Sequence, residues 1–157
     1  MSDAPAAVTD PGARNAIRLA EVTSDPIDPA RLLDLVSRPS AGAVALFVGK
    51  VRDHDAGAAT QVVALDYTCH PTAHDLIGEI VAAQVAALDP DGECAVAAAH
   101  RIGRLGVGEE AFVVAVSSAH RQLAFRVCEE IVEQVKRQLP IWKQQFEADG
   151  NHTWCGL

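Results

Sequence analysis

The feature that most constrains the fold is an amphipathic stretch over residues 118–139 that stops at a proline. Apolar side chains recur at helical spacing between residues 124 and 135, which predicts a helix with one apolar face. Pro140 ends this helix, because the residue before a proline disfavours the helical conformation. Ser117 or Ser118 precedes the pattern, and we expect one of them to cap the helix N-terminus.

The remaining patterns mix strands and helices in an irregular order. Strands are expected over residues 17–22, 41–52, 61–69, 93–103 and 110–119. Shorter helices are expected over residues 28–38, capped by Asp28, and from Thr72 or Asp75 to the turn at residues 89–92. The glycine-rich RLGVGE between the last two strands is expected to be a loop, and it lacks the GxGxxG pattern of dinucleotide-binding folds. Adjacent strands mixed with helices favour the α+β class.

Length and composition fit one globular domain. The 157 residues are 49% hydrophobic, which allows a sizeable core and argues against general disorder. No apolar run reaches the roughly 18 residues that a membrane-spanning helix needs. The N-terminal MSDAPAAVTDPGARN is acidic and broken by prolines, and it lacks the basic and apolar regions of a secretion signal. We therefore expect a disordered leader at residues 1–15, a single domain at residues 16–157, and a cytoplasmic protein.

The charge pattern argues for a small anionic ligand rather than nucleic acid. The net charge is -8, whereas nucleic-acid binding relies on clustered lysine and arginine. After Ser40, however, the basic residues recur in the short motifs GKVR, HRIGR, AHR, VKR and WK, which is consistent with a local cationic pocket. The four cysteines form no CxxC pair and the histidines show no ligand spacing, so no metal site is expected. His100, on a strand, is expected to pack or to lie at an interface.

The segment SSAHR places His120 and Arg121 in the first turn of the long helix. The partial positive charge at a helix N-terminus makes cations there mildly unfavourable unless an anion is present. The pair is therefore consistent with a phosphate or carboxylate site, in which arginine supplies two parallel donors. A solvated His-Arg pair at a helix start fits the same residues, and local physics leaves both interpretations open.

The segment VKRQLPIWKQQ holds Lys136 and Lys143, two of the chain's three lysines. Lys136 and Arg137 in the last helical turn stabilise the helix by complementing its dipole, which requires no further function. The alternative is a cationic site that also includes Lys143 beyond the proline, together with Lys50 and Arg52 at the end of a strand. A lysine partly desolvated beside an aromatic ring and other cations can act as an acid, a base or a nucleophile.

Five motifs together resemble the successive signatures of one protein family. They are FVGKVRDH (47–54), LDYTCHP (65–71), HRIGRLGVGE (100–109), VSSAHRQLAF (116–125) and VKRQLPIWKQ (135–144). Their order and spacing are similar to those of the molybdopterin synthase catalytic (large) subunit family, MoaE, over residues 41–154. Five motifs in register are far more specific than any one of them.

The resemblance implies a function, a fold and partners. Members of this family convert cyclic pyranopterin monophosphate (precursor Z) into molybdopterin by inserting two sulfurs as a dithiolene. The sulfur arrives as a thiocarboxylate on the C-terminal Gly-Gly of a small ubiquitin-like sulfur carrier, whose tail enters the pocket of the large subunit. The implied fold is an α/β-hammerhead-like α+β domain, with an antiparallel or mixed sheet and packed helices. The implied assembly is a homodimer within a heterotetramer, and no metal or cofactor is implied for this step.

The resemblance also assigns roles by position. Lys136 and Lys143 match the two lysines of the family's K-x-x-x-P-F-W-K pattern and are the expected catalytic residues. Lys136 would orient the thiocarboxylate and move protons, whereas Lys143 would line the pterin pocket. The expected substrate-binding residues are Lys50, Arg52, His120 and Arg121. The last two would bind the substrate phosphate.

The spacing along the long helix adds an independent constraint. Arg121 and Lys136 are 136 − 121 = 15 residues apart, which is about 22 Å along one helix. One small pterin does not easily touch both ends. If all the expected residues serve one site, His120 and Arg121 come from a neighbouring subunit, which predicts a dimer with composite sites.

The sequence departs from the family pattern at three places. Ile141 stands where the family commonly has phenylalanine, and residues 68–71 replace an E-x-Y-P-like segment that contributes to a pocket wall. The family often has a basic residue beyond the tryptophan matched by Trp154, whereas this sequence stops shortly after it. That anion contact is expected to be missing or to be supplied by Arg101 or Arg104. The alternative function is a non-catalytic dimeric module that holds a Gly-Gly tail or a phosphate ligand.

Overall fold

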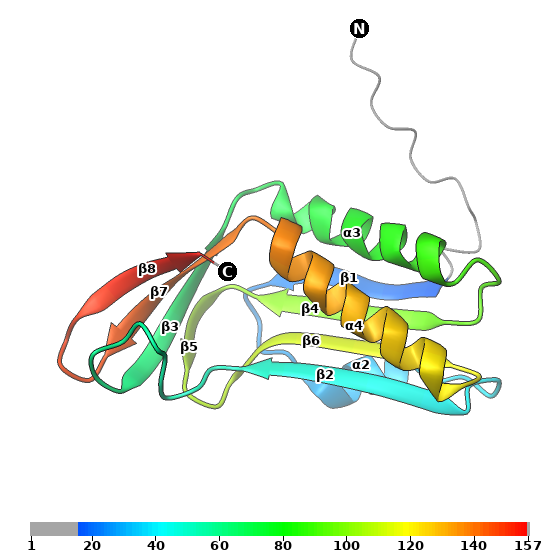
Figure 1. Cartoon of the computed structure of the whole chain (residues 1–157), viewed down its shortest axis with the longest axis horizontal. Helices are drawn as coiled ribbons and strands as arrows, with labels where there is room; N and C mark the ends of the chain where they lie inside the picture. Colours follow the sequence, from blue (N-terminus) through cyan, green and yellow to red (C-terminus); the bar gives the residue numbers. More distant parts are fainter. Residues whose placement is uncertain (1–15, 157) are drawn as a thin grey trace, which may run out of the picture.

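The structure is a computed structural model that describes residues 16–156, in which eight strands form two sheets and three helices pack against them (Figure 1). Sheet A has the strand order β1-β4-β6-β2, and its strands are β1 (Ile17–Thr23), β4 (Ala95–Arg101), β6 (Glu110–Ser118) and β2 (Ala43–Lys50). The helices are α2 (Pro29–Val36), α3 (Ala73–Leu88) and α4 (Arg121–Gln138). The predicted α+β class is confirmed, whereas the predicted leader at residues 1–15 lies outside the described residues.

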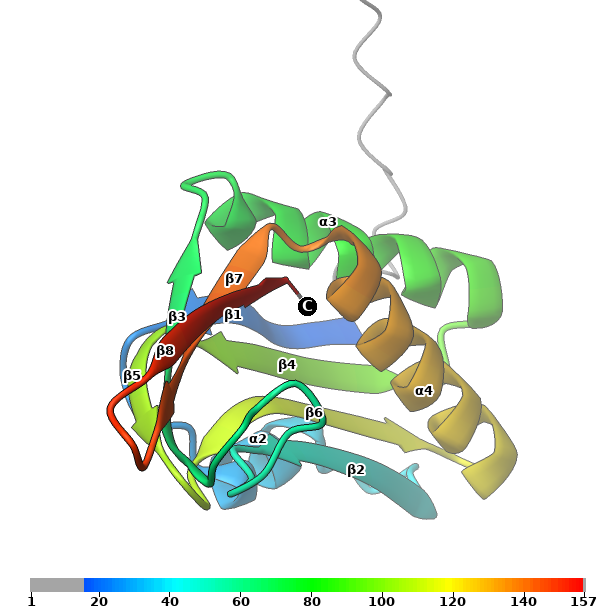
Figure 2. The same ribbon diagram turned by 60° about the vertical axis from the view of Figure 1, so that its left-hand side comes forward.

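Sheet B stands at one end of sheet A, and all its strand pairs are antiparallel (Figure 2). Its strand order is β5-β3-β7-β8, and its strands are β5 (Gly103–Gly106), β3 (Val62–Cys69), β7 (Ile141–Glu147) and β8 (His152–Gly156). The chain passes from sheet A to sheet B at Gly103, whose φ of 94° is a left-handed conformation that glycine adopts without strain. The chain enters sheet B again after α4, where Pro140 leads into β7. These crossings bring the ends of β4 and α4 beside sheet B.

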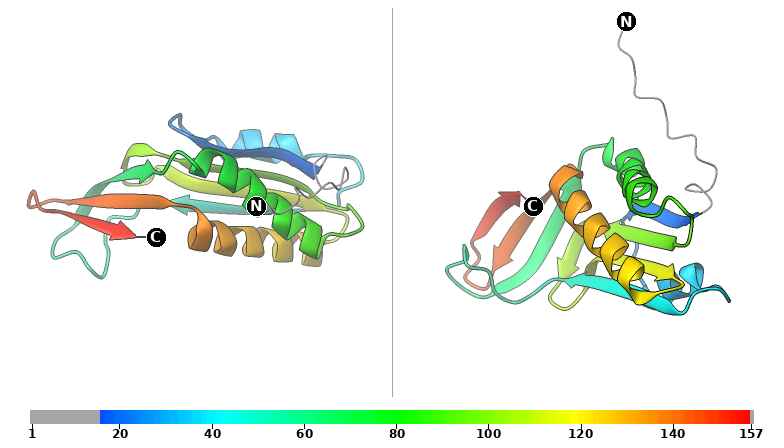
Figure 3. Two further views of the ribbon diagram at one scale, coloured as in Figure 1. Left: turned by 90° about the horizontal axis from the view of Figure 1, so that it is seen from above. Right: turned by 45° about the vertical axis from the view of Figure 1, so that its right-hand side comes forward.

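Both faces of sheet A are covered by helices (Figure 3). Along β4, the side chains of Ala95, Ala97 and Ala99 pack in the core beneath α2. Val96 and Ala98 point the other way, into the core shared with α3 and α4. Because neither face of the sheet meets water at its two central strands, β4 and β6 are continuous apolar runs rather than strands that alternate polar and apolar residues.

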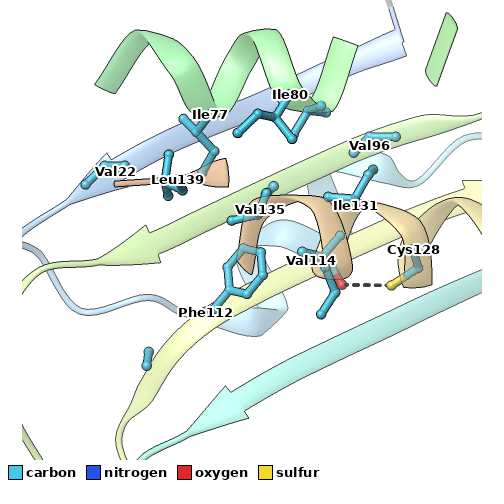
Figure 4. Close-up of a cluster of buried hydrophobic side chains, with 14 of the residues drawn as sticks. Val22, Ile77, Ile80, Val96, Phe112, Val114, Cys128, Ile131, Val135 and Leu139 are labelled. Carbon is cyan, nitrogen blue, oxygen red and sulfur yellow. Dashed lines mark hydrogen bonds between the residues drawn. The ribbon is translucent and has the colours of Figure 1, made fainter. Parts of the chain in front are cut away.

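The inner face of α4 closes the larger core (Figure 4). Ile131 and Val135 are almost fully buried, and the thiol of Cys128 donates to the carbonyl of Val114 at 3.8 Å. Burying an aliphatic side chain of this size stabilises a fold by about 1.5–3 kcal/mol. The predicted apolar face is confirmed, and its buried residues are Ala124, Val127, Cys128, Ile131, Val132 and Val135.

The predicted N-cap of the long helix is wrong. Ser117 and Ser118 are the last residues of β6, where β2 pairs with both, and the Ser117 hydroxyl donates to the carbonyl of Val36 at 2.6 Å. The helix begins at Arg121, with His120 in the N-cap position. Strand pairing and a buried hydrogen bond therefore hold the two serines in the sheet.

The sequence patterns also missed strands. The segment RLGVGE, expected to be a loop, begins inside β5, which pairs with β3 before the chain turns. The carboxylate of Glu109 closes this turn by accepting a hydrogen bond from the N–H of Gly106. Beyond Pro140 the chain forms β7 and β8, which the sequence pattern does not indicate because β7 is mostly polar and β8 is only five residues long.

The helices otherwise begin and end close to the predicted residues. The carboxylate of Asp28 caps α2 by accepting a hydrogen bond from the N–H of Ala30 at 3.0 Å. Thr72 precedes α3, and Asp89 ends it. Among the described residues, no helix is long and apolar enough to cross a membrane.

Candidate active site

A cavity of about 390 Å³ lies where the two sheets meet. Its walls come from the ends of β2, β4 and α4, the start of β6, the strands β3 and β7, and the loop after β2. Because β7 pairs with β3 immediately after Pro140, the last turn of α4 and the strand that follows it face the same space. The volume is in the range of small-molecule sites.

Four of the six predicted site residues line this cavity. They are Lys50, Arg52, Lys136 and Lys143. Lys143 is the most enclosed of them, with a side chain that is 21% exposed, whereas the other three are exposed. The ammonium of Lys136 lies 5.8 Å from the centroid of the Phe47 ring, within the range of cation–π attraction. Segments far apart in the sequence therefore gather positive charge in one hollow.

One carboxylate stands among these cations. Asp55 Oδ2 lies 3.9 Å from Lys143 Nζ and 3.9 Å from Arg52 Nη2, and Asp55 Oδ1 accepts a hydrogen bond from the N–H of Gly57 at 2.9 Å. This N–H, followed by the charges of Lys143 and Arg52, holds the pKa of the Asp55 carboxyl below its ordinary value. Asp55 is therefore ionised at neutral pH and offsets part of the charge of its two neighbours.

The loop after β2, which carries Asp55, is attached to β7. The carboxylate of Glu147, a residue only 6% exposed, accepts a hydrogen bond from the N–H of Thr60 at 2.9 Å. The N–H of Ala148 donates to the carbonyl of Gln61 at 2.8 Å. Both hydrogen bonds attach the loop to the end of β7, the strand that carries Lys143. They therefore help to hold Asp55 close to Lys143.

A buried histidine and two rings form another wall of the cavity. His100 stacks on Phe112 with ring centroids 5.3 Å apart and meets Tyr67 edge to face at 5.4 Å. Its Nδ1–H donates to the carbonyl of Arg101, so Nε2 is left as an acceptor. Burial, and to a smaller extent the charge of Lys136, lowers the pKa of His100 to about 4. The imidazole is therefore neutral at pH 7.

The other two predicted residues, His120 and Arg121, do not line the cavity. They stand at the first turn of α4, whereas Lys136 is in the last turn of the same helix (Figure 1). Both are exposed, and the side chain of His120 makes no capping hydrogen bond. Within one chain, the cavity therefore gathers its cations without the predicted phosphate-binding pair.

The two arginines expected to supply a further anion contact are engaged elsewhere. Arg101 Nη1 lies 3.4 Å from a carboxylate oxygen of Glu109, and the guanidinium of Arg104 lies 4.4 Å from the centroid of the Phe146 ring. Neither arginine lines the cavity, so the structure gives no support to that expectation.

Sequence patterns missed several residues of the cavity. His100 packs between rings as expected, but it also lines the cavity, and its place in the HRIGR motif was the available signal. Tyr67 likewise stands in the motif LDYTCHP, whereas Asp55 and Gln145 lie just outside the motifs and carry no such signal. The partner of Asp55 is Lys143, which lies far along the chain, so only the folded structure brings the two together.

Three of the four thiols are poorly suited to act as nucleophiles. Burial raises the pKa of Cys94 to about 12 and that of Cys128 to about 11, and it also raises the pKa of Cys69. These thiols are protonated at neutral pH, whereas the thiolate is the reactive form. Within residues 16–156, no group of three or more His, Cys, Asp or Glu side chains is arranged to hold a metal ion.

The cavity therefore combines four cations, one carboxylate and an aromatic wall. The cations attract an anion, and the rings offer a surface on which a planar molecule packs. The lysine ammonium groups are hydrogen-bond donors that can orient a carboxylate or transfer a proton. Such a site suits a planar molecule that carries negative charge.

Comparisons with known proteins agree with these features. The family model described as "MoaE protein" matches residues 22–138. A curated relative from Thermoplasma volcanium, named molybdopterin synthase catalytic subunit, is 36% identical over 139 residues, which cover 85% of this chain and 95% of the relative.

Two solved structures share the fold. The crystal structure of molybdopterin synthase from Staphylococcus aureus matches with a TM-score of 0.78 and 29% identity, over 88% of this chain and 97% of that chain. A complex of subunits 1 and 2 of the molybdopterin-converting factor from Helicobacter pylori matches with a TM-score of 0.65 and 19% identity, over 89% and 90% of the two chains. At that identity, the second likeness concerns the fold alone.

Proposed function

This chain belongs to the MoaE family, and we propose that it is the catalytic subunit of a molybdopterin synthase, which inserts two sulfurs into cyclic pyranopterin monophosphate to form a dithiolene. The family predicted from the five sequence motifs is confirmed. The observation that carries the proposed activity is the convergence of Lys50, Arg52, Lys136 and Lys143 on one cavity.

The roles of the site residues follow from where their charges lie. Lys136, exposed where α4 ends, orients the thiocarboxylate of an entering peptide and moves protons. Lys143 is more enclosed and lies beside Asp55, a position that suits contact with the pterin. Lys50 and Arg52 complete the cationic side of the pocket.

The sulfur comes from a small ubiquitin-like carrier that bears a thiocarboxylate on its C-terminal Gly-Gly. The Helicobacter pylori relative in fold is a complex of two subunits, which is consistent with such a partner. Three of the chain's four thiols are unsuited to carry the sulfur, because the pKa values of Cys69, Cys94 and Cys128 are raised, and this favours an external source. We place the protein in the cytoplasm, with a leader at residues 1–15 and a single domain at residues 16–157.

The complete site is shared between two copies of the chain. His120 and Arg121 are exposed at the start of α4, outside the cavity of their own chain. A homodimer within a heterotetramer allows this pair to bind the substrate phosphate in the neighbouring cavity, because a two-fold interface repeats each contact in both directions. The pair then supplies the anion contact that one chain lacks.

Reconstitution tests this function. The purified chain is mixed with thiocarboxylated carrier and cyclic pyranopterin monophosphate, and the dithiolene product is measured by mass spectrometry. The expected result is product that depends on both the chain and the thiocarboxylate, with unmodified carrier as the control. Binding of the carrier without any product would instead favour the non-catalytic module that holds a Gly-Gly tail.

A further inference from the structure

The cavity contains a negative charge that its expected substrate does not call for. Asp55 is the only acidic residue among the described residues that line it, and it stands on the side of Lys143 and Arg52. An anionic substrate alone would be bound better without this carboxylate. Its presence therefore points to a part of the ligand that needs an acceptor.

The hydrogen bonds of Asp55 leave one oxygen available. Oδ1 accepts from the N–H of Gly57 at 2.9 Å, which fixes the orientation of the carboxylate. Oδ2 lies 3.9 Å from Lys143 Nζ and 3.9 Å from Arg52 Nη2, which is longer than a hydrogen bond. Among the described residues, no hydrogen bond reaches Oδ2. A carboxylate oxygen of this kind accepts readily from a ligand N–H.

The carboxylate of Asp55 weakens the attraction for phosphate at this end of the cavity. The carboxylate of Asp55 offsets one of the two positive charges of Lys143 and Arg52 and would lie next to any anion bound between them. Lys136, at the end of α4, has no ion pair with an acid within the described part of the chain. The phosphate and the thiocarboxylate are thus better placed away from Asp55.

A planar ring with N–H donors fits the same place. The aminopyrimidinone part of a pterin presents adjacent N–H donors on one edge, and a carboxylate is their natural acceptor. The rings of Tyr67 and Phe112 and the neutral imidazole of His100 line the same cavity and offer a surface for the plane of the heterocycle.

We infer that Asp55 is a specificity-determining residue, whose carboxylate binds the N–H donor edge of the heterocycle and keeps phosphate away from Lys143 and Arg52. The identity of the heterocycle as a pterin rests on the proposed function. The inference fixes the direction in which the substrate lies: its donor edge faces the loop after β2, and its phosphate faces away.

The chain offers a matched control on the same loop. Asp53 carries the same charge and is exposed, but its carboxylate bonds to the side chains of His54 and Gln61 and does not line the cavity. Asp55→Asn and Asp53→Asn change the net charge equally and nearly preserve side-chain shape. Any difference between them therefore reports the local position of Asp55.

Two probes are titrated separately into the full chain and both variants by calorimetry: inorganic phosphate, and a pterin without a phosphate group. Asp55→Asn is expected to bind the pterin about ten-fold more weakly, because a charged acceptor is lost. It should bind phosphate about two- to five-fold more tightly, because a screening charge is removed. Asp53→Asn should stay within about two-fold of the unchanged chain for both probes.

The opposite directions of the two effects separate this inference from loss of the fold, which would weaken both. Equal phosphate affinity in the two variants, or unchanged pterin affinity in Asp55→Asn, overturns the inference. Because neither titration needs the sulfur carrier or product formation, the outcome is independent of whether the chain makes a dithiolene.

Discussion

Helix α4 carries cations at both ends, in opposite electrostatic settings. Lys136 and Arg137 lie in its last turn, where the helix dipole attracts positive charge. His120 and Arg121 lie at its start, where the dipole repels positive charge and the first turn contains no acidic residue. Within residues 16–156, neither member of this second pair forms an ion pair with an acid.

The difference shows which cations need a functional explanation. Helix stability alone accounts for Lys136 and Arg137, so the cavity position of Lys136 is what argues for a role in the site. Arg121 opposes the dipole and His120 leaves the N-cap without a capping hydrogen bond, and a local conflict of this kind is typical of functional positions. The exposed pair is therefore consistent with the proposed phosphate contact in the cavity of a neighbouring copy.

The largest expected effect separates the two cations at the C-terminal end. Lys136→Ala should lower product formation about a thousand-fold, because this side chain lines the cavity and its proposed role is proton transfer. Arg137→Ala removes a similar dipole contact one residue later and should leave activity within about two-fold. Single-turnover mass spectrometry gives the activities, and thermal unfolding compares the stabilities. Equal loss in both variants would assign the effect to the helix end rather than to the cavity.

The next test asks whether Lys136 of one copy and Arg121 of its neighbour act in the same site. Lys136→Ala and Arg121→Ala should each be inactive alone, because each damages every composite site. Mixing equal amounts under conditions of subunit exchange should restore about a quarter of the activity, because half of the dimers are mixed and one of their two sites is intact. Complete failure to recover, with exchange verified by mass spectrometry, would contradict a shared site.

His100, which lines the same cavity as Lys136, predicts that the free energy of unfolding depends on pH. His100 has a pKa of about 4 in the folded chain, below the ordinary value of 6.5. Because the depressed pKa disfavours the charged form in the folded state, stability is fully present above pH 6.5 and is lost as the pH falls toward 4. Lowering the pH from 7 to 4.5 should therefore reduce the free energy of unfolding by about 2–3 kcal/mol through His100.

Chemical denaturation at the two pH values measures that loss. His100→Asn keeps a donor for the carbonyl of Arg101 but does not titrate, so it is the matched comparison. Tyr67 and Lys136, from the elements that pack around the imidazole, stay unchanged in both proteins. An equal acid loss in the variant would assign the effect to carboxylates elsewhere, such as Asp53, Asp55 and Glu109, whose pKa values are lowered.

The smallest expected effect tests the conflict at the N-terminal end. His120 occupies the N-cap without a capping hydrogen bond, so His120→Asp should raise the free energy of unfolding by about 0.5–1 kcal/mol. The same change should raise the KM for the phosphorylated substrate about ten-fold, because a negative charge replaces a phosphate ligand. His120→Asn supplies a cap without the charge and should weaken binding less. A gain in stability with unchanged KM would remove His120 from the site.

Local rules explain what the sequence predicted correctly. Asp28 caps its helix and Pro140 ends α4 because each effect depends only on neighbouring residues. Ser117 follows the same capping preference but is held in β6 by pairing and by its bond to Val36, neither of which is visible locally. In β7, the polar residues Gln145 and Glu147 are buried. The strand therefore lacks the alternation of apolar and polar residues that would predict it.

The residues of the site also divide into those that the sequence predicted and those that it did not. The cations Lys50, Arg52, Lys136 and Lys143 stand in recognisable motifs, and the fold brings them together. Asp55 stands in the loop after β2, outside every motif, and its role depends on Lys143 on a distant strand. Negative charges that modify a cationic pocket are hidden in a sequence when their partners are remote.

The hydrogen bond between Thr60 and Glu147 attaches the loop that carries Asp55 to sheet B. Asp55 therefore lies with the strand that carries Lys143, whereas Lys136 lies on α4, which packs against sheet A. A molecule that contacts both Asp55 and Lys136 links sheet B to α4. Binding in the cavity would then make the folded chain more resistant to heat and to proteases than the empty chain.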